Sequence, residues 1–183
     1  MNFSLGADGD STQVRLRTLN LQSPWINAEL TNTVSFSWAG ELLAEPAQLH
    51  VAADLAKLPG TTLSGMVEGG VRIEPHGDRL PSVQFQFATG QVVAGGLDAK
   101  TILIQGEYTA PILKLDKLRA DLSDGSVLKV NGAFNTGTKQ IQAGHWQVAG
   151  GFLEKLIPGI RCAELVAAGD LQGAITNLTH RGD

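Results

Sequence analysis

The sequence of 183 residues is poor in cysteine, in charge and in aromatic side chains. Its single cysteine, Cys162, cannot form an internal disulfide, so the redox compartment stays open. Charged residues make up 17% of the chain, against about a quarter in a typical soluble domain. The net charge is -4, and because a general nucleic-acid binder shows a basic excess, that class of protein is not expected.

Long apolar runs are also missing. No stretch approaches the roughly 18 residues that a membrane-spanning helix needs. Residues 1–8 contain neither a basic region nor an apolar segment, so they do not form a signal peptide. If the protein is exported, we expect the signal to lie elsewhere in a longer chain, of which residues 1–183 are one segment.

The chain does contain much apolar material and much glycine. Hydrophobic residues account for 43% of the sequence, which is too many for a disordered chain. The 22 glycines follow no three-residue period, which excludes collagen. This composition favours a β-rich fold with many turns.

Apolar and polar residues alternate with a period of two along most of the chain. Val83, Phe85 and Phe87 alternate with Gln84 and Gln86, for example, which places apolar side chains on one face of a strand. Turn residues separate such runs every 8–15 residues or so, which is typical of an antiparallel meander with one apolar face. The glycines of 65–70 predict a bend or bulge within one strand.

Two segments, 53–60 and 150–159, interrupt the strand pattern. Each places two leucines three residues apart around a lysine and ends in Pro-Gly, which predicts one short helical turn. The segments lie about 100 residues apart, so we interpret 53–152 as one unit of a degenerate repeat flanked by partial neighbouring units. The whole of 1–183 is then a single β-repeat segment of an elongated array.

The same segments carry a resemblance to a known family. It rests on Ala-Asp-Leu-Ala-Lys-Leu at 53–58, on Tyr-Thr-Ala-Pro-Ile-Leu-Lys-Leu at 108–115, on Leu-Arg-Ala-Asp-Leu-Ser-Asp-Gly-Ser-Val-Leu-Lys-Val-Asn-Gly at 118–132, and on Trp-Gln-Val-Ala-Gly-Gly-Phe-Leu at 146–153. In these patterns of spacing and residue class, roughly residues 47–176 resemble the AsmA-like and TamB-like proteins of Gram-negative envelopes.

The resemblance implies a segment of a periplasmic protein that is anchored in the inner membrane by a helix outside this sequence. It implies a deeply curved sheet, the β-taco, with an apolar concave face. It further implies lipid transfer between the envelope membranes and, for TamB-like members, help in outer-membrane protein assembly. The expected partners are phospholipid acyl chains, outer-membrane assembly proteins and neighbouring repeats of the same chain.

We therefore expect an all-β fold: an antiparallel, strongly curved, elongated sheet forming an open trough, with one or two short helical turns. The alternative is a β-sandwich, serving as an adhesion or carbohydrate-binding module with Trp25 or Tyr108 in an aromatic platform. The residues expected to line a lipid groove share the apolar phase of their strands; they are Val34, Phe36, Trp38, Leu49, Val51, Val71, Ile73, Val83, Phe85, Phe87, Ile102, Ile104, Leu113, Leu115, Leu128, Val130 and Ile141.

Residue patterns for bond chemistry are lacking. The four histidines, at 50, 76, 145 and 180, show no metal-ligand spacing, and no Gly-x-Ser-x-Gly nucleophile motif exists. Residues 8–12 resemble the opening of a calcium loop, but Gln13 and Leu19 occupy positions that require Gly and Glu. We expect no enzyme activity, no metal and no cofactor.

Overall fold

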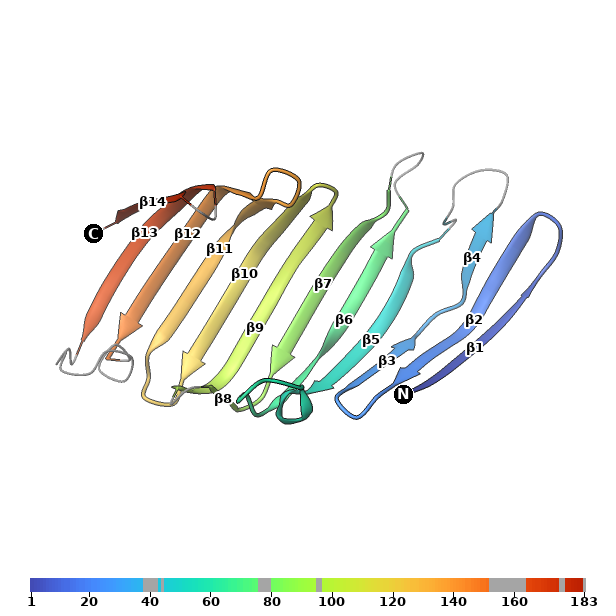
Figure 1. Ribbon diagram of the computed structural model, residues 1–183, viewed down its shortest axis with the longest axis horizontal. Coiled ribbons are helices and arrows are strands. Elements are labelled where there is room, and N and C mark those ends of the chain that lie inside the picture. Colours follow the sequence, from blue (N-terminus) through green and yellow to red (C-terminus); the bar gives the residue numbers. More distant parts are fainter. Residues whose placement is uncertain are drawn as a thin grey trace.

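The computed structural model describes residues 1–37, 43, 45–75, 80–94, 97–151, 164–174 and 177–182. Within this part of the chain, fourteen strands join into one antiparallel sheet that is not closed on itself (Figure 1). The strands are β1 (Asn2–Gly9), β2 (Gln13–Gln22), β3 (Ile26–Leu30), β4 (Val34–Ser37), β5 (Ala47–Asp54), β6 (Met66–Glu74), β7 (Ser82–Thr89), β8 (Val92–Ala94), β9 (Leu97–Thr109), β10 (Ile112–Leu122), β11 (Val127–Asn135), β12 (Gln140–Gly150), β13 (Leu165–Ala174) and β14 (Asn177–Gly182).

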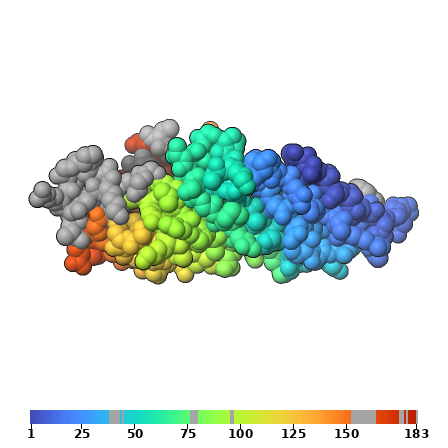
Figure 2. All heavy atoms as spheres, turned by 90° about the horizontal axis from the view of Figure 1, so that it is seen from below, coloured from blue at the N-terminus to red at the C-terminus, as the bar shows by residue number. Residues whose placement is uncertain are grey.

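The strand order follows the sequence, as a meander requires. The main path runs β1-β2-β3-β5-β6-β7-β9-β10-β11-β12-β13-β14, with β4 paired to β2 and β8 paired to β9. In the space-filling view the sequence colours run in order from one end of the elongated molecule to the other (Figure 2). The all-β, open and elongated antiparallel sheet predicted from the period of two is confirmed.

The β-sandwich alternative is wrong, because the described strands form no second sheet that covers the first. The accessible surface is 11341 Å². A compact monomer of 19.3 kDa exposes about 8,500 Å², so this molecule exposes about a third more. That excess is what a single layer produces, since the described strands contact their neighbours in the sheet and no second sheet.

Polar side chains set the ends of the strands. Asp10 accepts hydrogen bonds from the backbone N–H groups of Thr12 and Gln13 at 2.7 and 3.1 Å, which closes the β1–β2 turn. Asn135 accepts from Gly137 and Thr138 in the same way, both at 2.9 Å, at the β11–β12 turn. Of residues 8–12, Asp8 and Gly9 therefore end β1 and 10–12 form the hairpin turn, which fits their weak match to a calcium loop.

The first predicted helical turn is confirmed as a 3-10 helix, η1 (Leu55–Lys57). Asp54 caps it by accepting a hydrogen bond from Ala56 N at 3.1 Å, and Lys57 Nζ lies 2.9 Å from Asp54 Oδ2. The hydrogen bond to Lys57 lowers the pKa of Asp54 below its ordinary value. The second predicted turn, 150–159, falls mostly outside the described residues, and the repeat unit 53–152 stays a prediction.

The glycines of 65–70 differ from the expected bulge. β6 pairs with β5 and β7 without a register shift at Gly69 or Gly70. Fully buried apolar side chains are few, and one cluster joins Val34, Leu43 and Ala47. This small core packs against Leu30, Phe36 and Ile73 near one end of strands β3 to β6. Elsewhere in the described sheet, the side chains pack mainly against side chains of neighbouring strands on the same face.

Candidate functional site

The two faces of the sheet differ in chemistry, and the strand register assigns each residue to one of them. Cross-strand partners point to the same face, so a row of partners can be followed from strand to strand. Leu49 pairs with Val71, and Val71 pairs with Phe85. Following such rows across the sheet defines an apolar face and, on its other side, a polar face.

The register places sixteen of the residues expected to line a groove on the apolar face. One row runs from Val51 through Phe87, Ile104 and Leu118 to Val130. Trp38, the remaining candidate, lies outside the described residues. The sixteen are Val34, Phe36, Leu49, Val51, Val71, Ile73, Val83, Phe85, Phe87, Ile102, Ile104, Leu113, Leu115, Leu128, Val130 and Ile141.

The register adds further residues to the apolar face, and β-bulges change the strand phase at two places. The register of β10 shifts between Leu115 and Leu118, which brings Leu118 to the same face as Leu115 despite their odd spacing. A similar shift between Ile141 and Gly144 in β12 places Ile141 and Trp146 on one face. Only the pairing partner reveals such a phase change. The residues that the register adds to the expected lining include Leu16, Leu19, Leu21, Tyr108, Leu118, Phe134, Trp146, Val148 and Leu171.

Aromatic rings on the apolar face lie over glycines of neighbouring strands. A Cβ at Gly106 would lie 2.7 Å from Cζ of Phe85, and one at Gly69 would lie 2.7 Å from Cδ1 of Phe87. The two rings stack with their centroids 6.3 Å apart. The absent glycine side chains therefore make room for the rings to lie along the sheet.

The same arrangement recurs near the C-terminal end of the sheet. A Cβ at Gly169 would lie 2.9 Å from Nε1 of Trp146 and 2.7 Å from Nε2 of His180. The Trp146 and His180 rings stack at 5.4 Å. Trp146 pairs with Val130 and so belongs to the apolar face, as its phase with Val148 indicates in the sequence.

Most side chains of the apolar face are half-buried. In β6 and β7 the alternating apolar positions are intermediate in exposure while most of their polar-phase neighbours are exposed. Within the described part of the chain no second sheet covers these side chains. The side chains of the apolar face therefore shield one another from solvent, and each remains partly accessible.

The polar face carries short-range ion pairs between neighbouring residues. Arg119 donates to both carboxylate oxygens of Asp121, with its shortest contact at 2.7 Å. The hydrogen bond and charge of Arg119 lower the pKa of Asp121, and the same contact raises the pKa of Arg119. Lys114 Nζ lies 2.6 Å from Asp116 Oδ1, and this hydrogen bond raises the pKa of Lys114. Such exposed pairs contribute little stability.

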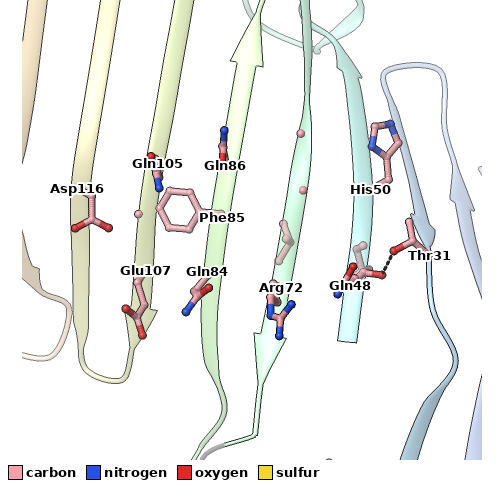
Figure 3. A pocket seen from close by; sticks show the side chains of 15 residues that line it. Thr31, Gln48, His50, Arg72, Gln84, Phe85, Gln86, Gln105, Glu107 and Asp116 are labelled. Atoms are coloured by element: carbon pink, nitrogen blue, oxygen red, sulfur yellow. Dashed lines mark hydrogen bonds between the residues drawn. The ribbon is translucent and has the colours of Figure 1, made fainter. Parts of the chain in front are cut away.

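A hollow of about 640 Å³ lies on the polar face over strands β5, β6, β7 and β9 (Figure 3). Its side-chain walls include Gln48, His50, Arg72, Gln84, Gln86, Gln105, Glu107 and Asp116. A second hollow of about 290 Å³ lies on the same face beside His145 and Asp170. Sequence reasoning missed both hollows, because it assigned polar-phase residues only to solvent.

The histidines described by the structure pair with carboxylates or with an aromatic ring. His50 Nε2 lies 3.3 Å from Glu68 Oε1, and His145 Nδ1 lies 3.0 Å from Asp170 Oδ1. His76 lies outside the described residues. In the described residues no group of three or more His, Cys, Asp or Glu side chains could hold a metal ion.

Trp25 and Tyr108, either of which the sandwich alternative offers for an aromatic platform, lie at opposite ends of the strands. Trp25 lies in the β2–β3 turn beside the start of η1, where its carbonyl accepts a hydrogen bond from Asp54 N. Tyr108 is half-buried on the apolar face opposite Val83 and Leu113, at the other end of the strands. The two rings therefore cannot contact one ligand ring together.

Among the helices that the described residues form, none has the length and apolar character needed to cross a bilayer. Comparison with family models, with curated proteins and with solved structures finds no match to this chain.

Proposed function

We propose that this chain is a non-enzymatic segment of an AsmA-like or TamB-like periplasmic protein and that its apolar face shields phospholipid acyl chains. The observation that supports this most is the shared orientation of the sixteen apolar residues on one side of a single-layer sheet. A sheet normally covers such a face with a second layer. An accessible apolar face of this kind marks a site of interaction.

The dimensions of the apolar face suit acyl chains. From Ile102 to Tyr108 it spans six residues along β9, or about 20 Å. One leaflet of a bilayer has a hydrocarbon thickness of about 15 Å, which is half of the usual 30 Å core. Across the sheet, the eight strands from β5 to β13 on the main path extend about 34 Å. Several acyl chains can thus lie side by side on one continuous surface.

The energetics favour hydrocarbon without requiring a particular headgroup. Each methylene that is transferred from water to an apolar environment contributes about 0.8 kcal/mol. The side chains that line the rows are mostly Val, Ile, Leu and Phe, which offer neither charge nor hydrogen bonds. Binding by this face is therefore a matter of solvation, and a chain can slide along the rows without breaking a specific contact.

The resemblance carries the cellular part of the proposal. It places the segment in the periplasm, as part of a protein anchored in the inner membrane, and it implies neighbouring repeats as partners. Assistance to outer-membrane protein assembly follows from the same resemblance. The open sheet is compatible with such an array, because both outermost strands, β1 and β14, have one unpaired edge among the described residues.

Extraction of a labelled phospholipid tests this function. The chain is mixed with vesicles that contain a self-quenched fluorescent phospholipid, and dequenching reports removal of the lipid from the bilayer. We expect wild-type protein to extract lipid and Val130→Arg to lose most of this activity, because a guanidinium would enter the apolar row beside Leu118 and Trp146.

Lys129→Gln is the matched control, since Lys129 precedes Val130 but lies exposed on the polar face. Equal extraction by Val130→Arg and by wild type, at equal unfolding midpoints, would contradict the proposed function.

A further inference from the structure

The hollow on the polar face lies in the middle of the sheet. Its floor is the backbone of β5, β6, β7 and β9 (Figure 3). Gly70 of β6 lines this floor and contributes no side chain. A Cβ at Gly70 would meet only the carbonyl oxygen of Leu49, at 3.8 Å, so the space above this residue is open. The volume of about 640 Å³ falls within the range of small-ligand sites.

Four glutamine side chains surround this floor: Gln48, Gln84, Gln86 and Gln105. Gln86 pairs directly with Gln105 across β7 and β9. Within the described residues none of the four side-chain amides takes part in a hydrogen bond. Each amide offers two donor hydrogens and an acceptor oxygen, so the hollow presents donors and acceptors together.

Two of the charged groups beside the hollow pair with a neighbour of opposite charge. Arg72 pairs with Glu74, His50 lies near Glu68, and Asp116 pairs with Lys114. Glu107 accepts a hydrogen bond from Thr109 Oγ1 at 3.2 Å. Arg72 and Lys114 are thus outnumbered by carboxylates, so the surroundings of the hollow are weakly acidic and disfavour an anionic ligand.

We propose that this hollow binds a neutral, hydroxyl-rich ligand, namely a glycan segment, through its glutamine amides and the open floor at Gly70. Sugar hydroxyls act as donor and acceptor at once, which matches the amide groups. Phe85 is among the residues that line the hollow but belongs to the apolar face, and His50 is the aromatic side chain that the described polar face offers there, so we expect weak binding with a Kd on the order of 1 mM.

A peptide is the competing ligand, and the position of the hollow argues against it. Extended peptides gain most of their affinity by adding to a free strand edge. The strands below the hollow, β5, β6, β7 and β9, each pair on both sides, so their backbone groups are already used.

This inference is independent of the acyl-chain proposal, because the two sites lie on opposite faces. ¹⁵N-labelled chain is titrated with maltohexaose, cellohexaose and chitohexaose, each to about 10 mM, while the side-chain amide signals of glutamine are followed. We expect at least one glycan to shift the Gln86 and Gln105 signals.

Two variants examine the same contacts. Gly70→Val fills the floor of the hollow, and Gln86→Ala combined with Gln105→Ala removes two facing amides without touching the floor. Each is expected to weaken glycan binding at least tenfold, with the unfolding midpoint retained. Gln22→Ala is the control and should leave binding unchanged, because Gln22 is an exposed glutamine on β2, away from the hollow.

Three results would overturn the proposal. The first is the absence of any amide shift with all three glycans. The second is binding that Gly70→Val and the double glutamine variant leave unaffected. The third is tighter binding of a neutral, extended hexapeptide than of any glycan at the same amides, which would assign the hollow to a peptide.

Discussion

The ring of Phe85 occupies the place where a side chain of Gly106 would stand. The two residues are cross-strand partners on β7 and β9, and Cζ of Phe85 would lie 2.7 Å from a Cβ at position 106. The glycine is thus matched to the ring that covers it. This relationship makes the apolar face smooth at its centre, where Phe85 and Phe87 stack.

Substitution at Gly106 should therefore destabilise the sheet. Gly106→Ala pushes a methyl group against the Phe85 ring and the carbonyl oxygen of Lys114, and we expect a loss of about 1–3 kcal/mol in the free energy of unfolding. Gly70→Ala is the control, because its Cβ has free space, and we expect it to be neutral or to stabilise by up to about 1 kcal/mol. Urea unfolding measures both changes, and equal effects at the two positions would contradict this packing.

The bulge in β10 predicts which face Leu118 occupies. With uninterrupted alternation from Leu115, residue 117 would lie on the apolar face, whereas the register places Leu118 there beside Ile104 and Val130. An environment-sensitive fluorophore on Leu118→Cys should report an apolar surrounding, and the same label on Lys117→Cys a watery one. Cys162→Ser in the background leaves a single labelling site. A more apolar signal from residue 117 would show that the bulge is absent.

The cap of η1 by Asp54 predicts that the free energy of unfolding depends on pH in the acid range. The hydrogen bond from Lys57 lowers the pKa of Asp54 below its ordinary value of 3.8. The stabilisation by the ionised Asp54 is therefore complete above the unfolded-state pKa and is lost as the pH falls through the lower folded-state pKa. Lys57→Ala should raise the pKa of Asp54, as followed by ¹³C NMR of its carboxyl group.

The same variant should narrow the difference in urea midpoint between pH 7 and acid pH, compared with wild type. Lys139→Ala serves as the control, because Lys139 is an exposed lysine in the β11–β12 turn, far along the sheet from Asp54. An unchanged Asp54 pKa in Lys57→Ala would mean that the ion pair does not form in solution.

The sequence suffices for the fold class and for most of the apolar face, because the apolar and polar residues keep their period of two over most of the strand residues. The run from Val83 to Phe87 alternates without interruption, and its phase is correct in the structure. The turns at Asp10 and Asn135 could also be predicted, since their side chains bond to the local backbone. The strand alternation and the turns both depend on residues that are close together in the sequence.

Features that depend on pairing could not be predicted. Leu118 shares a face with Leu115, and Ile141 shares one with Trp146, only because bulges shift the register, and a bulge is set by the partner strand. Gly69 and Gly70 suggest a bend in isolation, yet one receives the Phe87 ring and the other leaves the floor of a hollow open. The glutamine-lined hollow arises from four strands, so no single segment of sequence indicates it.

Photo-crosslinking tests most directly whether the apolar face holds acyl chains. A photoreactive phenylalanine analogue is placed at Phe85 or Val130 on the apolar face, and at Gln84 or Lys129 on the polar face, in chain incubated with phospholipid vesicles. Capture of phospholipid from Phe85 and Val130, and not from Gln84 and Lys129, is the expected result. Capture only from Gln84 and Lys129, or equal capture from both faces, would contradict the proposal.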